Sequence, residues 1–456
     1  GGPAVSSLAT VSKSRRKPMP EMPELAENPK PRISLFRNFV ALVGAEAFSK
    51  VITFGAFAYL ARICGPAGFG YVEWSAAILM CASLIVDQGF SSYGAREIAK
   101  DPGSTGKFVA EIVSARFLLA ALSFAAIVAF AFTFVREESV LKLVLAYGLS
   151  LWTLPLLLQW VFQGHDRMKL VAITQLIRQT VFVAVVITLV RRADDLVFVG
   201  FAELAGVTVA AIFSLWAYRR FFAGKVWFKP TISKQLFFEG TPIGLSQGFW
   251  VLRMFGATLI LGLVASAEDT GYFAGAMRIF IALHTFVFLY YFNLLPSLSR
   301  AWVDGREQFG WLIRRSMRIV VAACVVVGSV WYLLAPTMMT VSYGGSFLNG
   351  ASALQWLAGA WIAAAISGHY RFGLVAAGQQ KKEMFTSALG ALVVVILIPF
   401  GYLNGGPAGA AAGVFFAEVS VLISSWLLAK RTLFGVPSMI ENANRHLFGG
   451  AAETPR

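Results

Sequence analysis

Six cationic side chains interrupt the long apolar runs of this sequence, and together they indicate a site for an anion. They are Lys50, Arg116, Arg178, Arg253, Arg278 and Arg371. A cation at membrane depth costs at least about 2.5–3.5 kcal/mol on insertion scales unless it faces water, a partner or a ligand. Three of the six fall in each half of the chain. We therefore expect a polar cavity between two helical lobes, with these cations holding something anionic.

Each cation also has an ordinary structural explanation. Lys50 follows Glu46 by four residues, so the two side chains can pair along one helix face. Arg116 lies in the first turns of its apolar run, and its long side chain can reach back to the interface. Arg278 and Arg371 lie toward opposite ends of their runs and can serve as headgroup anchors in the same way.

Acidic side chains inside the apolar runs are fewer. We expect them to neutralise the cations or to take part in gating or ion coupling, and they are Glu46, Asp87, Glu203 and Glu418. Asp87 and Arg96 flank the end of one run, where their positions predict a gating pair. Arg178 lies near two glutamines and can also form a polar contact between helices.

The composition requires that most of the chain lies in a membrane. Mean hydropathy is +0.68, and 14% of the 456 residues are charged, against about 25% in ordinary soluble domains. The pattern indicates a polytopic all-α membrane protein. The three cysteines have no CxxC spacing and no clustered histidines, so the sequence predicts neither a disulfide framework nor a zinc site.

About twelve apolar runs are long enough to cross a bilayer, since a span takes roughly 20 residues. The predicted spans are 38–62, 71–93, 108–134, 141–162, 170–190, 196–217, 241–265, 272–296, 318–340, 351–377, 384–403 and 408–429. Residues 1–32 are basic and proline-rich with few large apolar side chains. They are predicted to be a disordered cytoplasmic tail rather than a cleavable signal peptide.

The loop charges predict the orientation. Of the 39 Lys and Arg residues, 28 fall on the side of the N-terminus, five on the other side and six within the runs. Positive loops stay in the cytoplasm. We therefore expect an inner-membrane protein with both termini cytoplasmic.

The sequence also indicates an internal repeat of two similar halves. Gly70-Tyr71 and Gly271-Tyr272 each open a span after a short outward turn. Two six-helix lobes with the same starting side are expected to be related by an axis along the membrane normal. The predicted divisions are an N-lobe at 33–217, an inter-lobe loop at 218–240, a C-lobe at 241–430 and a C-terminal tail at 431–456.

Several short motifs resemble a known family. The stretches 65–71, 87–90 and 94–100 resemble the N-terminal signature of Wzx-type polysaccharide flippases. These belong to the multidrug/oligosaccharidyl-lipid/polysaccharide exporter superfamily. Residues 261–274 and 371–378 are similar to the second half of the same family. The likeness extends over about residues 33–433.

The resemblance implies a MATE-like fold and a flippase function. The cargo would be an undecaprenyl-diphosphate-linked oligosaccharide, moved by alternating access for exopolysaccharide, capsule or O-antigen synthesis. Arginine suits such a cargo because its planar fork binds phosphate bidentately. Many relatives carry an acid near Arg253, where this chain has Phe255 and Gly256, which puts any ion coupling through that acid in doubt.

Two other function classes compete with a flippase. A MATE-type multidrug or metabolite/cation antiporter would favour carboxylates in its cavity, whereas mid-span cations outnumber acids here. A membrane enzyme would need paired carboxylates or a metal motif on a sizeable loop, and the sequence shows neither. We predict a non-enzymatic protein without cofactors or metals. Its expected partners are the lipid-linked oligosaccharide, membrane lipids, and polysaccharide polymerase and chain-length or export proteins, with no nucleic acid.

Overall fold

The computed structural model describes the backbone of residues 1, 32–222 and 234–433, and the side chains of residues 1, 51–222 and 234–433. Most of the two predicted tails and part of the inter-lobe loop lie outside these ranges, as do the side chains of Glu46 and Lys50. Contacts divide the chain into Gly1–Gly44 and Ala45–Arg456. The description below concerns the second unit.

The described residues form seven α-helices in the first half of the chain. They are α1 (Arg32–Asp87), α2 (Phe90–Lys100), α3 (Thr105–Phe134), α4 (Glu138–Leu149), α5 (Gln159–Gly164), α6 (Met168–Leu189) and α7 (Val197–Phe222). Short 3₁₀ turns join several of them, at Pro102–Ser104, Ser150–Trp152, Leu154–Leu156 and Ala193–Leu196.

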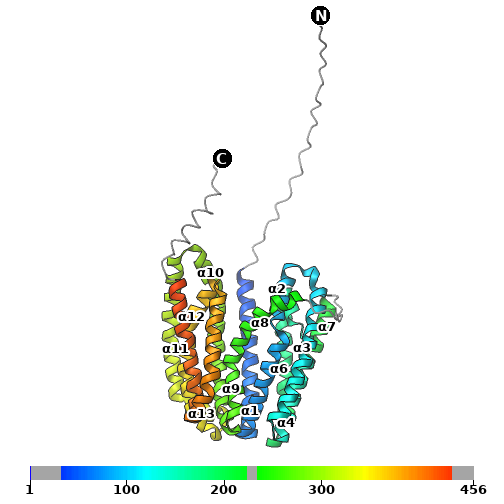
Figure 1. The fold of residues 1–456 in the computed structure, drawn as a ribbon, viewed down its shortest axis with the longest axis vertical. Helices are drawn as coiled ribbons and strands as arrows, with labels where there is room; N and C mark the ends of the chain where they lie inside the picture. Colours follow the sequence, from blue (N-terminus) through cyan, green and yellow to red (C-terminus); the bar gives the residue numbers. More distant parts are fainter. Residues whose placement is uncertain (2–31, 223–233, 434–456) are drawn as a thin grey trace. The chain divides into compact units, whose positions relative to one another are not determined.

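The second half contains six. They are α8 (Lys234–Met254), α9 (Gly256–Val264), α10 (Ala267–Asp304), α11 (Arg306–Tyr343), α12 (Ala351–Ala376) and α13 (Gln380–Thr432), with a 3₁₀ turn at Gly345–Gly350. Within Ala45–Arg456 the long helices run alongside one another (Figure 1). The described residues form no strand, so the predicted all-α fold class is confirmed.

Glycines divide the two longest helices into pairs of spans. Gly65 has φ 65° inside α1, and Gly405 and Gly406 leave the helical region inside α13. Gly406 has φ 56°, a conformation that glycine adopts without strain. A proline follows each break, and proline fits the first turn of a new helix. Both breaks fall at turns that the sequence predicts.

Two predicted spans are interrupted. The 241–265 run is bent by 51° between α8 and α9, at Phe255. The 141–162 run ends its first helix at Leu149 and restarts at Gln159, with Pro155 in the 3₁₀ turn between. Proline removes a backbone donor, and this breaks a helix in its interior.

The number of spans fits the prediction of about twelve. By length and composition, eight described helical segments can cross a membrane, and the bent α8–α9 pair makes nine. Two of the eight, with 50 and 53 residues, contain the breaks at Gly65 and at Gly405–Gly406. Counting α1 from Arg32, each break has enough residues on both sides for a span, and α12, with 26 residues, is long enough for one more.

The loops define two ends of the bundle. We call one the Gly65 end, where the breaks at Gly65 and Gly405 and the α9–α10 turn lie. The other is the Arg96 end, where α2 begins and where α10 turns into α11 at Gly305.

At the Gly65 end, the backbones of α1 and α10 touch. A Cβ atom on Gly70 would overlap the Ala267 carbonyl oxygen, and one on Gly271 would overlap the Pro66 carbonyl oxygen. Trp74 donates a hydrogen bond to the Leu259 carbonyl at 3.1 Å. The repeated Gly-Tyr motif therefore forms a reciprocal contact between the two halves.

At the Arg96 end, α2 meets α8. Gly89 has φ 78° and approaches the backbone of Gly240 and Gly244 so closely that a Cβ atom there would lie 2.5 Å from the Gly244 nitrogen. Gln247 donates a hydrogen bond to the Ser92 hydroxyl at 3.2 Å. The two halves are thus in contact at both ends.

The Gly70–Gly271 contact gives a direct prediction about stability. Replacing Gly271 by valine is expected to lower the midpoint of thermal unfolding, because the added atoms force two backbones apart at a cost of about 1–3 kcal/mol. Gly55→Ala is the matched control, since a Cβ atom there meets nothing within 4 Å. An unchanged midpoint for Gly271→Val, measured in detergent, would show that this contact does not form.

Candidate functional site

An ion pair between α1 and α10 joins the two halves at a cavity. Arg278 donates to Glu73 Oε1 through Nε at 2.7 Å and Nη2 at 2.5 Å. The guanidinium carbon also lies 3.2 Å from the centre of the Phe57 ring. The side chains are 22% and 12% exposed, so the pair is held firmly but remains accessible.

This pair lines a cavity of about 250 Å³ between α1, α9 and α10. Three hydroxyls, from Thr53, Thr258 and Thr285, share the wall with apolar side chains. Thr53 donates a hydrogen bond to Gln179 of α6 at 3.0 Å. The cavity therefore presents charge, hydroxyls and an aromatic wall in one place, which suits a polar ligand.

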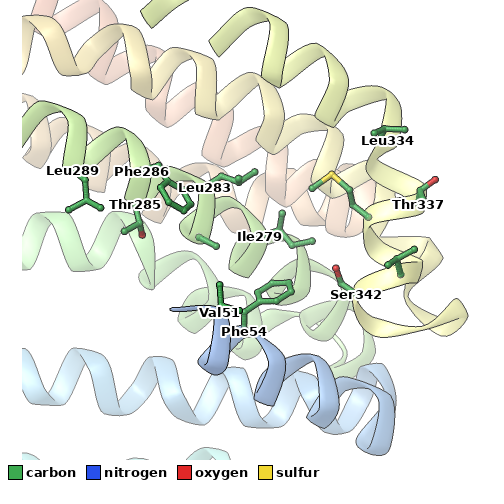
Figure 2. Close-up of a pocket in the computed structure, with 13 residues that line it drawn as sticks. Val51, Phe54, Ile279, Leu283, Thr285, Phe286, Leu289, Leu334, Thr337 and Ser342 are labelled. Atoms are coloured by element: carbon green, nitrogen blue, oxygen red, sulfur yellow. The ribbon is translucent and has the colours of Figure 1, made fainter. Parts of the chain in front are cut away.

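A larger and mainly apolar groove of about 480 Å³ lies next to this cavity, between α1, α10 and α11. Figure 2 shows Val51 and Phe54 on α1, Leu283 and Phe286 on α10, and Leu334 on α11 around it. Its polar wall atoms come from three hydroxyl side chains, those of Thr285, Thr337 and Ser342.

The groove and the charged cavity are adjacent. Phe54, Ala282 and Thr285 line both of them. A polar group beside Arg278 and an apolar chain along the groove would therefore lie next to each other.

A second polar cavity, of about 210 Å³, lies within the second half. Arg371 donates to Glu383 through Nε at 2.9 Å and Nη2 at 2.5 Å, and both side chains line the cavity. Trp250, His284 and Tyr291 complete the polar and aromatic part of the wall. Here too an arginine at a cavity is balanced by a carboxylate.

The most deeply buried pair lies between α8 and α13. Arg253 Nε is 3.3 Å from Glu418 Oε1, and the side chains are 1% and 0% exposed. None of the three guanidinium nitrogens and neither carboxylate oxygen has a hydrogen-bond partner among the described residues. Arg253 lies two residues before the break at Phe255, so the pair fixes this helix to α13 at its bend.

Two further pairs lie within the first half. Arg116 donates to Asp87 and to the Ser91 hydroxyl, and it is 7% exposed. Arg178 of α6 donates to Glu203 of α7. Asp87, Glu203 and Glu418 thus each pair with an arginine, while the side chain of Glu46 lies outside the described residues.

The predicted pair between Asp87 and Arg96 is wrong. Asp87 is the last residue of α1, and the left-handed backbone of Gln88 and Gly89 turns the chain so that the carboxylate meets Arg116. Arg96 is exposed and lies 3.1 Å from Glu97 and 3.5 Å from Glu239 of α8. Hydrogen bonds from Lys100 and Arg96 hold the pKa of the Glu97 carboxyl below its ordinary value.

The expected cationic chamber is charge-balanced in the described part of the chain. All five described mid-span arginines have a carboxylate partner: Arg116, Arg178, Arg253, Arg278 and Arg371. Sequence reasoning missed two of the partners, Glu73 and Glu383. Arg278 and Arg371 line cavities, whereas Arg116 and Arg253 are enclosed by protein. The structure describes no contact of the Lys50 side chain.

Comparisons with known proteins identify the family to which this chain belongs. Residues 35–302, more than half of the chain, match a family described as polysaccharide biosynthesis protein. The chain belongs to this family. The resemblance seen in the sequence motifs is thereby confirmed.

Two curated relatives of this polysaccharide biosynthesis protein are proposed O-antigen transporters. The one from Escherichia coli K12 is 22% identical over 81% of this chain and 90% of its own length. The one from Shigella dysenteriae is 23% identical over 85% of this chain and 98% of its own length.

Solved structures confirm the MATE-like fold of this polysaccharide biosynthesis protein. An inward closed structure of the lipid II flippase MurJ has a TM-score of 0.69 at 13% identity, covering 91% of this chain and 94% of its own. An inward-facing MATE multidrug transporter of the MOP superfamily has a TM-score of 0.67 at 14% identity, covering 85% and 94%.

Proposed function

We propose that this protein is a flippase for a polyprenyl-diphosphate-linked oligosaccharide, undecaprenyl diphosphate being the lipid that the family resemblance implies. The observation that carries the proposal is that the charged cavity at Arg278 lies next to the apolar groove and shares three lining residues with it. Such a cargo combines an anionic headgroup with a long apolar chain, and the two adjacent spaces match this division. Family membership and the names of the curated relatives support the same class of cargo.

The ion pair at the cavity supplies a way to bind the diphosphate. In the absence of cargo, Glu73 balances Arg278, which lowers the cost of a cation at membrane depth. A diphosphate offers the guanidinium more charge and more acceptor oxygens than one carboxylate does. We infer that Arg278 exchanges its carboxylate for the headgroup when the cargo enters, and that Arg371 receives the headgroup in the same way.

Transport then proceeds by alternating access of the two halves. The α2–α8 contact at the Arg96 end must open when the cavity faces that side. The change that tests this is Ser92→Cys with Gln247→Cys, made with the three native cysteines replaced by alanine. Cross-linking this pair in membrane vesicles is expected to reduce transport to background.

Cleavage of the cross-link is expected to restore the activity. Thr105→Cys with His165→Cys is the control, because both residues belong to the first half. Thr105 Oγ1 lies 2.9 Å from His165 Nε2. Full transport by the cross-linked Ser92–Gln247 pair would argue against opening at this end.

The orientation follows from the loop charges. We propose that the Arg96 end faces the cytoplasm of a bacterial inner membrane and that the cargo moves from the cytoplasmic to the outer leaflet. The excess of Lys and Arg on this side supports the assignment. A polysaccharide polymerase and chain-length or export proteins would then use the delivered cargo.

One observation favours a second candidate, a MATE-type exporter of organic cations. Glu73 and Glu383 place carboxylates on both polar cavities, so cations do not outnumber acids there as the sequence had suggested. The apolar groove beside the cavity suits the long polyprenyl chain of a flippase cargo, and a compact organic cation would leave most of it unused.

The test is deletion of the protein followed by analysis of lipid-linked oligosaccharides. A flippase predicts that the completed lipid-linked unit accumulates on the cytoplasmic face, while drug sensitivity stays unchanged. If the protein exports organic cations, the lipid-linked unit is expected not to accumulate, and drug sensitivity is expected to change. An enzyme predicts that an incomplete unit accumulates, and either of these results would overturn the proposal.

A further inference from the structure

One face of α11 carries an arginine cluster that the transport site does not use. Arg314, Arg315 and Arg318 are exposed, as is Trp311, which is 49% exposed. None of the three arginines has an acidic partner within the described ranges 51–222 and 234–433. The Arg315 guanidinium lies 5.0 Å from the centre of the Trp311 ring, and such stacking holds it at the surface.

The cluster lies on the side of α11 that faces away from the other helices. Residues 311, 315 and 318 follow the three- and four-residue spacing of one helix face. The buried side chains of this helix, such as Ile313, Ser316 and Cys324, lie on the opposite face. The arginines therefore point outward, and they do not form part of the protein core.

The same outward face continues as an apolar stripe. Ile319, Val326, Val330 and Leu333 are all at least half exposed. From Ile319 to Val341 the helix rises about 33 Å at 1.5 Å per residue, which matches a hydrocarbon core of about 30 Å. The arginines therefore lie at the edge of the hydrocarbon core, at the depth of lipid phosphates.

We propose that Trp311, Arg314, Arg315 and Arg318 form a binding site for the phosphate headgroup of an anionic phospholipid, whose acyl chains lie on the apolar stripe. Arginine binds phosphate through its planar fork, and tryptophan favours this interfacial depth. A soluble protein partner would not need the apolar stripe, whereas a phospholipid uses both parts of the surface.

The test uses the full chain, purified in detergent and stripped of lipid. Phosphatidylglycerol is titrated while the midpoint of thermal unfolding is followed, with phosphatidylcholine and inorganic phosphate in parallel. Phosphatidylglycerol is expected to raise the midpoint of the wild type in a saturable manner. Phosphatidylcholine is expected to act more weakly, and inorganic phosphate alone to have no effect.

The decisive comparison is between two double variants. Arg315→Gln with Arg318→Gln is expected to weaken phosphatidylglycerol binding at least about tenfold, because it removes from the site two of the three guanidinium groups that would bind the phosphate bidentately. Arg219→Gln with Arg220→Gln removes two exposed arginines from the end of α7 and is expected to bind as the wild type does.

Lysines at 315 and 318 keep the charge and lose the fork, so intermediate binding is expected from that variant. Equal binding by the two glutamine variants would overturn the proposal. So would an equal effect of inorganic phosphate, because this would identify a phosphate site without a lipid.

Discussion

Polysaccharide export is expected to fall at least about tenfold when Arg278 is replaced by alanine, with the protein still present in the membrane. Arg278 is the one described mid-span arginine that lines the cavity between the two halves, and we place the diphosphate there. Loss of one partner of a close charge pair commonly costs 2–5 kcal/mol in binding. The measurement is exported polysaccharide per unit of protein in the membrane.

The controls separate binding from stability. Arg278→Met combined with Glu73→Leu removes both charges, so it leaves no unpaired charge in the membrane and is expected to be stable yet inactive. Arg278→Lys is expected to retain part of the activity, because the charge remains while the fork is lost. Arg136→Ala changes an exposed arginine outside the spans and is expected to have no effect. Normal export by the Met/Leu variant would remove Arg278 from the mechanism.

The second large effect is expected on stability, at the Arg253–Glu418 pair. Replacing Arg253 by methionine leaves Glu418 buried without a counter-charge, and breaking a buried pair in this way costs about 3–5 kcal/mol. We expect a lower midpoint of thermal unfolding and less protein in the membrane. The pair is enclosed between α8 and α13, and no other cation among the described residues lies within ion-pair distance of the Glu418 carboxylate.

The double variant Arg253→Met with Glu418→Leu tests whether the pair only stabilises the fold or also takes part in transport. Removing both charges is expected to restore the midpoint, because buried pairs add little net stability over packed apolar side chains. If the double variant also exports polysaccharide, the pair serves only the fold. If it is stable and inactive, the pair takes part in transport. A single Arg253→Met variant as stable as the wild type would contradict the burial described here.

The sequence predicted the helices well because hydropathy alone decides which segments cross a bilayer. The breaks at Gly65 and Gly405–Gly406 carry turn residues that can be read directly. The interruption around Pro155 and the bend at Phe255 lie inside apolar runs. At Phe255 the only such signal is the single glycine that follows, Gly256, and one glycine does not distinguish a bend from a continuous span.

The residues of the candidate site could be predicted only in part from the sequence. A cation within an apolar run is conspicuous, so the arginines could be found. Glu73 lies in the first turn of the predicted run 71–93, and Glu383 lies directly before the run 384–403, so both acids look like parts of loops. Arg278 and Glu73 are 205 residues apart, and no periodicity links them. The pairing of Asp87 with Arg116 depends on the turn at Gln88 and Gly89, whose left-handed backbone the residue types alone do not specify.

The most direct measurement of the central claim is flipping of a lipid-linked oligosaccharide in proteoliposomes that contain the purified protein. The fraction of headgroups accessible to a membrane-impermeant glycosidase is followed over time. The account predicts faster exchange between leaflets than in protein-free vesicles, with Arg278→Ala close to the protein-free rate. Wild-type exchange no faster than in empty vesicles, with cargo present and protein folded, would contradict it.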